Sequence, residues 1–96
     1  MSKHNEHSIK DAIEALLKAY KLDDKLDEKK LISSWDNVMG KMIANHTTDI
    51  YIKHKQLFVS LDSPALKNEL LLAKSKMVQM LNTSVGKEII NDIIFK

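Results

Sequence analysis

The stretch that decides the fold is DIYIKHKQLFVSL, residues 49–61. Apolar side chains occupy every second position on both sides of a short polar segment, 54–56, which is typical of two half-buried strands joined by a turn. This spacing predicts a β-hairpin whose core-facing residues are Ile50, Ile52, Leu57, Val59 and Leu61. The residues between them would face the other way, namely Tyr51, Lys53, Phe58 and Ser60.

Before the hairpin, apolar residues recur at the helical spacing of three and four. One such stripe is Ile9, Ala12, Ile13, Leu16, Leu17 and Tyr20. Ser8 precedes this stripe and Asp11 follows three residues later, a pairing typical of a helix N-cap. A second stripe, 31–43, follows an acidic connector at 23–28 and predicts a helix that ends near His46. Residues 1–7 are expected to be a disordered lead-in to one domain over residues 8–96.

After the hairpin, Ser63-Pro64 predicts the start of a third helix. A hydroxyl can cap free backbone N–H groups, and proline suits the first helical position. This helix should end before Gly86, with residues 82–84 frayed. The Ile-rich segment 88–95 is expected to be a third strand with Ile93 and Phe95 inward. The order α-α-β-β-α-β predicts an α+β, two-layer domain with the helices on one face of a three-stranded sheet.

Size and composition argue against several classes of protein. Ninety-six residues make one domain and leave little room for an enclosed active site. The chain has no cysteine, and its His and acidic residues match no metal, nucleophile or phosphate-loop motif. We therefore expect no metal, no cofactor, no small-molecule substrate and no enzymatic activity. Residues 1–8 lack the apolar core of a signal peptide, and no apolar run approaches a membrane span, so we expect a cytoplasmic location.

Three blocks of the sequence resemble one bacterial family. They are WDNVMGKMIANHT at 35–47, LFVSLDSPALKNEL at 57–70, and a C-terminal block of Leu81-Asn82, Gly86 and Ile93-Ile94-Phe95. In order and spacing they are similar to the DciA-like family (domain of unknown function 721), and the resemblance runs from Ser8 to Lys96. It implies a KH-like fold, a role in DNA replication as a loader of the replicative DnaB-type helicase, and affinity for DNA. The segment 40–43 departs from the Gly-x-x-Gly loop of nucleic-acid-binding KH domains, because it lacks the second glycine.

Five residues are predicted to be structural. Trp35 lies on an apolar stripe, which favours core packing over stacking on a base. Gly40 costs a helix about 1 kcal/mol and so indicates close packing or a kink, with an approaching ligand as the alternative. His46 suits the C-terminal end of a helix better than the role of a catalytic base. Pro64 and Gly86 are expected to begin and end the third helix.

Two sets of residues are candidates for binding. Tyr51 and Phe58 are predicted to pair across the hairpin on its non-core face. They would either stack on single-stranded bases or, as the sequence alone favours, be covered by the first helix or a partner subunit. Between residues 41 and 76, six lysines stand against three acids. This set is a solvated face by default and a phosphate-binding surface in the alternative: Lys41, Lys53, Lys55, Lys67, Lys74 and Lys76.

Two functions remain open from the sequence. The first is a nucleic-acid-linked binding module near the replicative helicase, with weak lysine–phosphate affinity for single-stranded or duplex DNA. All fifteen basic residues are lysine, which favours contacts to phosphate over reading of bases. The second is a protein-interaction adaptor with no direct nucleic-acid binding, in which the Tyr51/Phe58 face or the first helix docks a partner protein.

Overall fold

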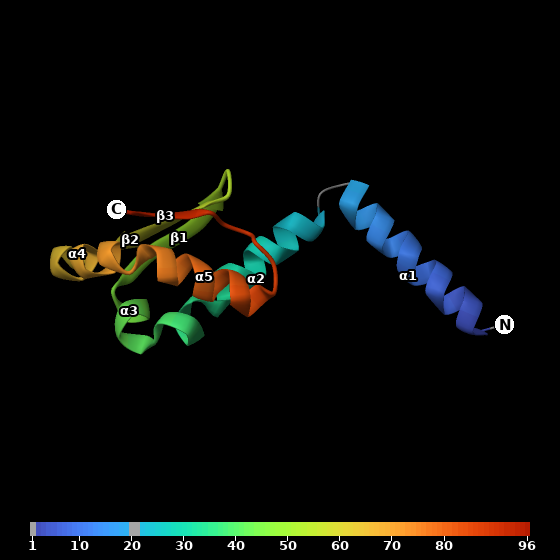
Figure 1. The fold of residues 1–96 in the computed structure, drawn as a ribbon, viewed down its shortest axis with the longest axis horizontal. Helices are drawn as coiled ribbons and strands as arrows, with labels where there is room; N and C mark the ends of the chain where they lie inside the picture. The colour runs from blue at the N-terminus through green and yellow to red at the C-terminus, as the bar shows by residue number, and fades with distance from the viewer. Residues whose placement is uncertain (1, 20–21) are drawn as a thin grey trace.

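The computed structural model describes residues 2–19 and 22–96, and it confirms the predicted α+β order. Figure 1 shows the elements along the chain. They are α1 (Ser2–Ala19), α2 (Leu22–Met39), α3 (Lys41–Asn45), β1 (Thr47–Lys53), β2 (Gln56–Leu61), α4 (Pro64–Leu72), α5 (Lys74–Val85) and β3 (Asp92–Phe95). The second and third predicted helices are each broken in two, as α2 with α3 and as α4 with α5.

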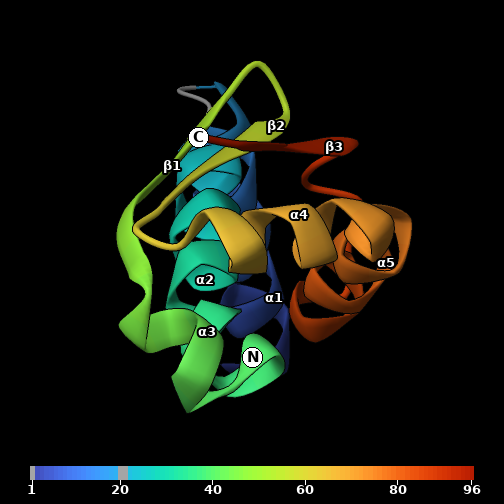
Figure 2. The same ribbon diagram turned by 90° about the vertical axis from the view of Figure 1, so that its left-hand side faces the viewer.

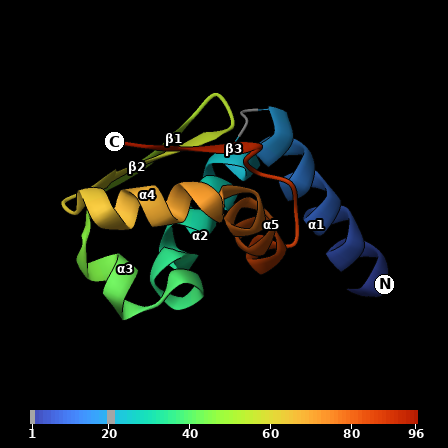
Figure 3. The same cartoon turned by 60° about the vertical axis from the view of Figure 1, so that its left-hand side comes forward.

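The sheet has the strand order β1-β2-β3. β1 and β2 are antiparallel, with Tyr51 opposite Phe58, whereas β2 and β3 are parallel, with Phe58 opposite Ile94. A parallel neighbour requires a crossover connection, and α4 with α5 provides it. Figures 2 and 3 show α2, α4 and α5 on one side of the sheet, which gives the two layers expected from the sequence.

The core lies between the inner face of the sheet and helices α2 and α5. Leu57, Val59 and Ile93 on the strands have no exposed surface, and neither do Leu31 on α2 and Leu81 on α5. Full burial of one such side chain contributes about 1.5–3 kcal/mol to folding. The predicted inward register of β3 is confirmed, since Ile93 and Phe95 are both buried. The strand itself begins only at Asp92, four residues later than Glu88.

Trp35 joins the helical layer to the first strand. Its side chain is 2% exposed and packs in the core, and its indole N–H donates to the hydroxyl of Thr47 at 3.0 Å. That hydroxyl in turn donates to the carbonyl of Ile43 at 2.8 Å. The polar edge of the indole is therefore satisfied inside the protein, as a buried tryptophan requires, and its position fixes where α3 ends and β1 begins.

Gly40 breaks the second helix because of its backbone conformation. Its φ of 92° and ψ of 166° lie in a region that is essentially restricted to glycine. Apart from Gly40 and its two chain neighbours, no atom of the described residues lies within 4 Å of the position that a Cβ would occupy, so close packing does not explain this glycine. The kink alternative describes Gly40 correctly: α2 ends at Met39, and α3 continues in a new direction (Figure 1).

The N-terminal helix differs from the sequence-based expectation. α1 begins at Ser2, so residues 2–7 form part of a helix instead of a disordered lead-in, and Ser8 lies inside the helix rather than at its N-cap. No glycine or proline precedes Ser8 to stop the helix from extending. α1 projects away from the two-layer body (Figure 1). Its apolar residues Ile9, Ile13 and Leu16 are all more than half exposed.

The third predicted helix starts and ends where expected. The Ser63 hydroxyl accepts from the backbone N–H of Leu66 at 3.3 Å, and Pro64 occupies the first turn. The helix is interrupted at Ala73, where α4 gives way to α5. At the other end Gly86 has a left-handed conformation, with φ 85° and ψ 15°. Its N–H and that of Lys87 bond back to carbonyls of the last turn, which closes the helix.

The two glycines should respond differently to the same pair of substitutions. Gly40→Ala and Gly40→Asn are both expected to lower the free energy of unfolding by about 1–3 kcal/mol, because neither residue tolerates this backbone region. Gly86→Asn should cost less than Gly86→Ala, since asparagine tolerates the left-handed region. Urea denaturation followed by circular dichroism measures all four variants. Equal tolerance of asparagine at both positions would contradict this account of Gly40.

Candidate binding surface

The outer face of the sheet carries one row of large side chains across all three strands. Tyr51 on β1, Phe58 on β2 and Ile94 on β3 occupy matching register positions. Their neighbours along each strand point inward to the core, so this row faces the opposite side. All three are half-buried rather than buried. The strands thus form an apolar strip on the sheet face away from the helices.

Tyr51 and Phe58 form the predicted aromatic pair. Their ring centroids lie 4.9 Å apart, and the ring planes are within 8° of parallel. The predicted alternative in which the first helix covers them does not hold. The residues of α1 whose exposure the structure gives, 8–16, 18 and 19, are all exposed, and α1 extends away from the sheet (Figure 3).

Lys96 belongs to this surface, although it was not among the lysines predicted from the sequence. Its ammonium lies 5.3 Å from the Tyr51 ring centroid and 5.2 Å from that of Phe58, and it donates to the Tyr51 hydroxyl at 2.9 Å. An ammonium at this distance from aromatic faces is attracted by their π electrons. The available signal was alternation along β3, because Ile94 and Lys96 fall on the same face when Ile93 and Phe95 point inward.

The structure does not gather the six predicted lysines on one surface. Lys53 lies two residues from Tyr51 on the same face of β1, and Lys55 is in the adjoining turn. Lys41 begins α3, beyond the other end of β1, and a seven-residue strand spans about 20 Å. Lys67 and Lys76 lie on the helices of the other layer. The surface selected by geometry is therefore Lys53, Lys55 and Lys96 around the aromatic pair, and we call it the sheet platform.

Lys74 is engaged elsewhere. Its ammonium lies 3.3 Å from the carboxylate of Asp92, the first residue of β3. Both side chains are about one-third exposed, so this ion pair contributes modestly to stability. It neutralises an acid at the margin of the sheet platform, where an unpaired carboxylate would repel phosphate.

His46 has a carboxylate partner that the sequence spacing did not reveal. It caps α3 as predicted, with its backbone N–H bonded to Ile43, and its Nδ1 lies 2.7 Å from the Asp62 carboxylate. Both side chains are about half exposed. The Asp62 N–H also donates to the His46 carbonyl, so the pair fastens the end of β2 to the start of β1. Among the described residues no cluster of three or more His, Asp or Glu side chains is placed to hold a metal ion.

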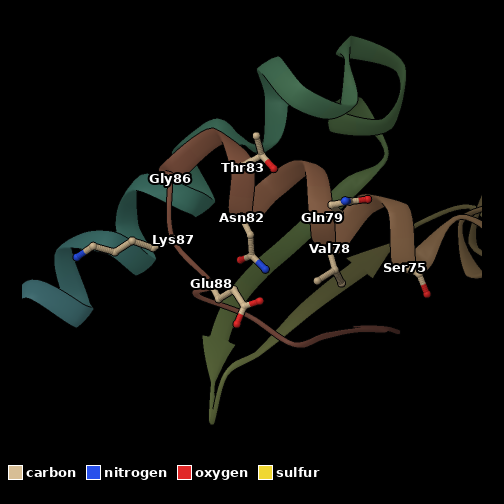
Figure 4. A pocket seen from close by; sticks show the side chains of 8 residues that line it. All are labelled: Ser75, Val78, Gln79, Asn82, Thr83, Gly86, Lys87 and Glu88. Atoms are coloured by element: carbon tan, nitrogen blue, oxygen red, sulfur yellow. The ribbon is translucent and has the colours of Figure 1, made fainter.

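A shallow groove with a volume of about 630 Å³ runs along α5. Figure 4 shows its lining, which includes Asn82, Gln79 and Thr83 on α5 and Glu88 beyond it. Asn82 is already occupied: its amide nitrogen donates to the Ile90 carbonyl, and its oxygen accepts from the N–H groups of Ile89 and Ile90. The predicted fraying at Asn82 is wrong, because this side chain holds the 88–90 segment against α5. The main polar side chain of the groove therefore has a structural role, and no ligand is needed to explain it.

Comparison with known proteins gives one family and one relative. Residues 8–95 match the family model described as "Dna[CI] antecedent, DciA". A "UPF0232 protein" of Corynebacterium glutamicum (strain R) is 34% identical over 61 residues, which is 64% of this chain and 34% of that protein. The chain thus spans about a third of that relative's length. No solved structure matches. None of the described helices has the length and apolar character that a membrane span needs.

Asn82→Ala should destabilise the domain strongly, although Asn82 lines a shallow surface groove. It removes three hydrogen bonds and leaves the N–H of buried Ile90 without a partner, so we expect a loss of about 2–3 kcal/mol in the free energy of unfolding. The matched control is Thr83→Ala, one residue along the same groove, which should change it by less than about 0.5 kcal/mol. Urea denaturation compares them. Equal effects would mean that Asn82 does not brace this segment.

Proposed function

Since the chain belongs to the DciA family, whose members are associated with helicase loading, we propose that it is a non-enzymatic binding module for the replicative DnaB-type helicase and for DNA. The observation that carries the DNA part is the sheet platform, where stacked aromatic rings lie beside three lysines. A protein that acts on the replicative helicase would do so in the cytoplasm, so a cytoplasmic location is part of the proposal.

The sheet platform suits single-stranded DNA better than a duplex. Unpaired bases can stack on aromatic rings, a contact worth about 1–3 kcal/mol per base that does not depend on sequence. Tyr51 stacks on Phe58 with one ring face, and both residues are only half-buried, so the pair keeps exposed surface on which a base could stack. The lysines supply the phosphate contacts. Lysine is a point charge without the two-pronged geometry of arginine, so the platform would hold DNA without reading its sequence.

The affinity contributed by these lysines should be modest and sensitive to salt. Three ammonium groups neutralise up to three phosphates, and each releases counterions from the strand. Asp49, on the same face of β1, opposes this attraction. A module of this kind gains from being held near DNA by a second contact, and a helicase partner would provide one.

A second candidate function is a protein-interaction adaptor that does not touch DNA. The specific observation in its favour is α1, whose Ile9, Ile13 and Leu16 form an apolar stripe and are each more than half exposed. Exposed apolar stripes on amphipathic helices are typical of protein-docking surfaces. Under this alternative the lysines serve only to keep the surface solvated.

Neutralising the platform lysines should weaken DNA binding selectively. Lys53→Gln/Lys96→Gln is expected to lower the affinity for a single-stranded oligonucleotide several-fold and to reduce the slope of log K against log salt by about 1–2. Fluorescence anisotropy at about 50 and 200 mM salt measures both quantities. The matched control is Lys41→Gln/Lys76→Gln, which removes the same charge from the helical side and should have a smaller effect. Equal losses in the two variants would reject the platform, and no binding by the wild type at the lower salt would remove DNA from the proposal.

The helicase part of the proposal is tested separately. The tagged chain should recover the host's replicative helicase after nuclease treatment, because the contact is between proteins. Ile13→Asp/Leu16→Asp should abolish recovery if α1 is the docking surface, whereas Tyr51→Ala/Phe58→Ala should leave recovery unchanged while weakening DNA binding. Circular dichroism checks that each variant remains folded. Failure of the wild type to recover the helicase would contradict the family role.

A further inference from the structure

The β1 edge of the sheet is open. β1 has β2 on one side and, among residues 2–19 and 22–96, no strand on the other, and residues 49–53 pair regularly with β2. The register shift between Thr47 and Asp49 ends this regular segment on one side, and the hairpin turn ends it on the other. Asp49 and Lys53, which bound the segment, are both exposed. An open edge of this kind can accept a further strand.

The hydrogen bonds of the central strand show which β1 groups are free. The Val59 carbonyl accepts from the Lys96 N–H at 2.8 Å, and the Leu61 N–H donates to the Lys96 carbonyl at 3.0 Å. Val59 and Leu61 therefore bond toward β3. Because alternate residues of a strand bond to opposite sides, Phe58 and Ser60 bond toward β1. Ile50 and Ile52 lie opposite Val59 and Leu57, at positions without cross-strand hydrogen bonds. Their N–H and C=O groups therefore point away from β2, toward the open edge.

Only a few antiparallel registers let Ile50 and Ile52 bond to a second β1. The register centred on Ile50 sets Asp49 opposite the partner's Tyr51, and the register centred on Ile52 sets Tyr51 opposite the partner's Lys53. Neither of these registers pairs Asp49 with Lys53. The register centred on Tyr51 sets Ile50 opposite the partner's Ile52, which satisfies four free backbone bonds. It also sets Asp49 opposite the partner's Lys53, twice by symmetry. Cross-strand pairs of opposite charge stabilise such a pairing, and like charges oppose it.

We infer that β1 is a self-association edge, on which a second copy of this chain pairs antiparallel about a two-fold axis at Tyr51. The charge pattern is what selects a second copy as the partner, since Asp49 and Lys53 are equally spaced about Tyr51 on one face. A lysine on an edge strand usually discourages pairing, but in this register it meets a carboxylate. The two sheets would join into one of six strands, with Tyr51 beside the partner's Tyr51. This inference does not depend on the proposed function, but the two would compete on β1, because the partner's Asp49 would engage Lys53 and the partner's Tyr51 would lie beside Tyr51.

The first test uses charge reversal. Sedimentation equilibrium should show a weak dimer of the full chain with a dissociation constant between about 10 μM and 1 mM, because a single strand pair buries less than a standard interface. Lys53→Asp and Asp49→Lys should each weaken the dimer at least tenfold, and the double variant Asp49→Lys/Lys53→Asp should return to within about threefold of the wild type. A wild type that stays monomeric to about 1 mM, or a double variant no better than the single ones, overturns the proposal.

The second test is covalent and requires no tight binding. The chain has no cysteine, so Tyr51→Cys introduces one thiol, and the partner's equivalent thiol would sit across the two-fold axis. The Cα atoms of such a pair lie about 4.5 Å apart, within reach of a disulfide. Mild oxidation should yield a disulfide-linked dimer, whereas Ser60→Cys on the same face of the central strand should not. Equal yields from both variants would show random collision and reject the paired edge, and circular dichroism of each variant confirms its fold.

Discussion

Burial of a single face of the sheet is the constraint on which the rest of the structure depends. Leu57 and Val59 on the central strand lie against helices from both sides of the hairpin in the sequence, and they have no exposed surface. Since side chains alternate along a strand, the same backbone must present Phe58 outward. The candidate binding surface is thus a direct product of the core, and Phe58, its central side chain, is held by the strand that carries Leu57 and Val59.

Local patterns made the hairpin and its aromatic pair predictable. Alternation over residues 49–61 fixes which side chains share a face, and Tyr51 and Phe58 follow from that alone. The caps at Ser63 and Gly86 are equally local, because each depends on backbone groups within a few residues. Gly40 was recognisable as an exception inside a helical pattern, but only its dihedral angles distinguish a break from close packing.

Features that depend on strand order could not be predicted in the same way. Lys96 reaches Tyr51 because β3 is the parallel neighbour of β2, and the sequence does not state that order. The separation of Lys41 from Lys53 has the same origin, since Lys41 lies beyond the start of β1 and Lys53 is the last residue of that strand. Asn82 resembled a fraying residue because its partners, Ile89 and Ile90, lie outside any regular element. Long-range geometry therefore decided the composition of the site, while local chemistry decided its central pair.

The parallel pairing of β2 with β3 has a kinetic consequence. β1 and β2 are joined by a turn of two residues, and hairpins of this type form in about 1–10 μs. β3 reaches β2 only across residues 62–91, a connection that includes α4 and α5, and such long closures slow folding. During that interval the central strand is still an edge on its β3 side. The time needed to close this connection thus determines how long the central strand of the nascent sheet is open to wrong partners.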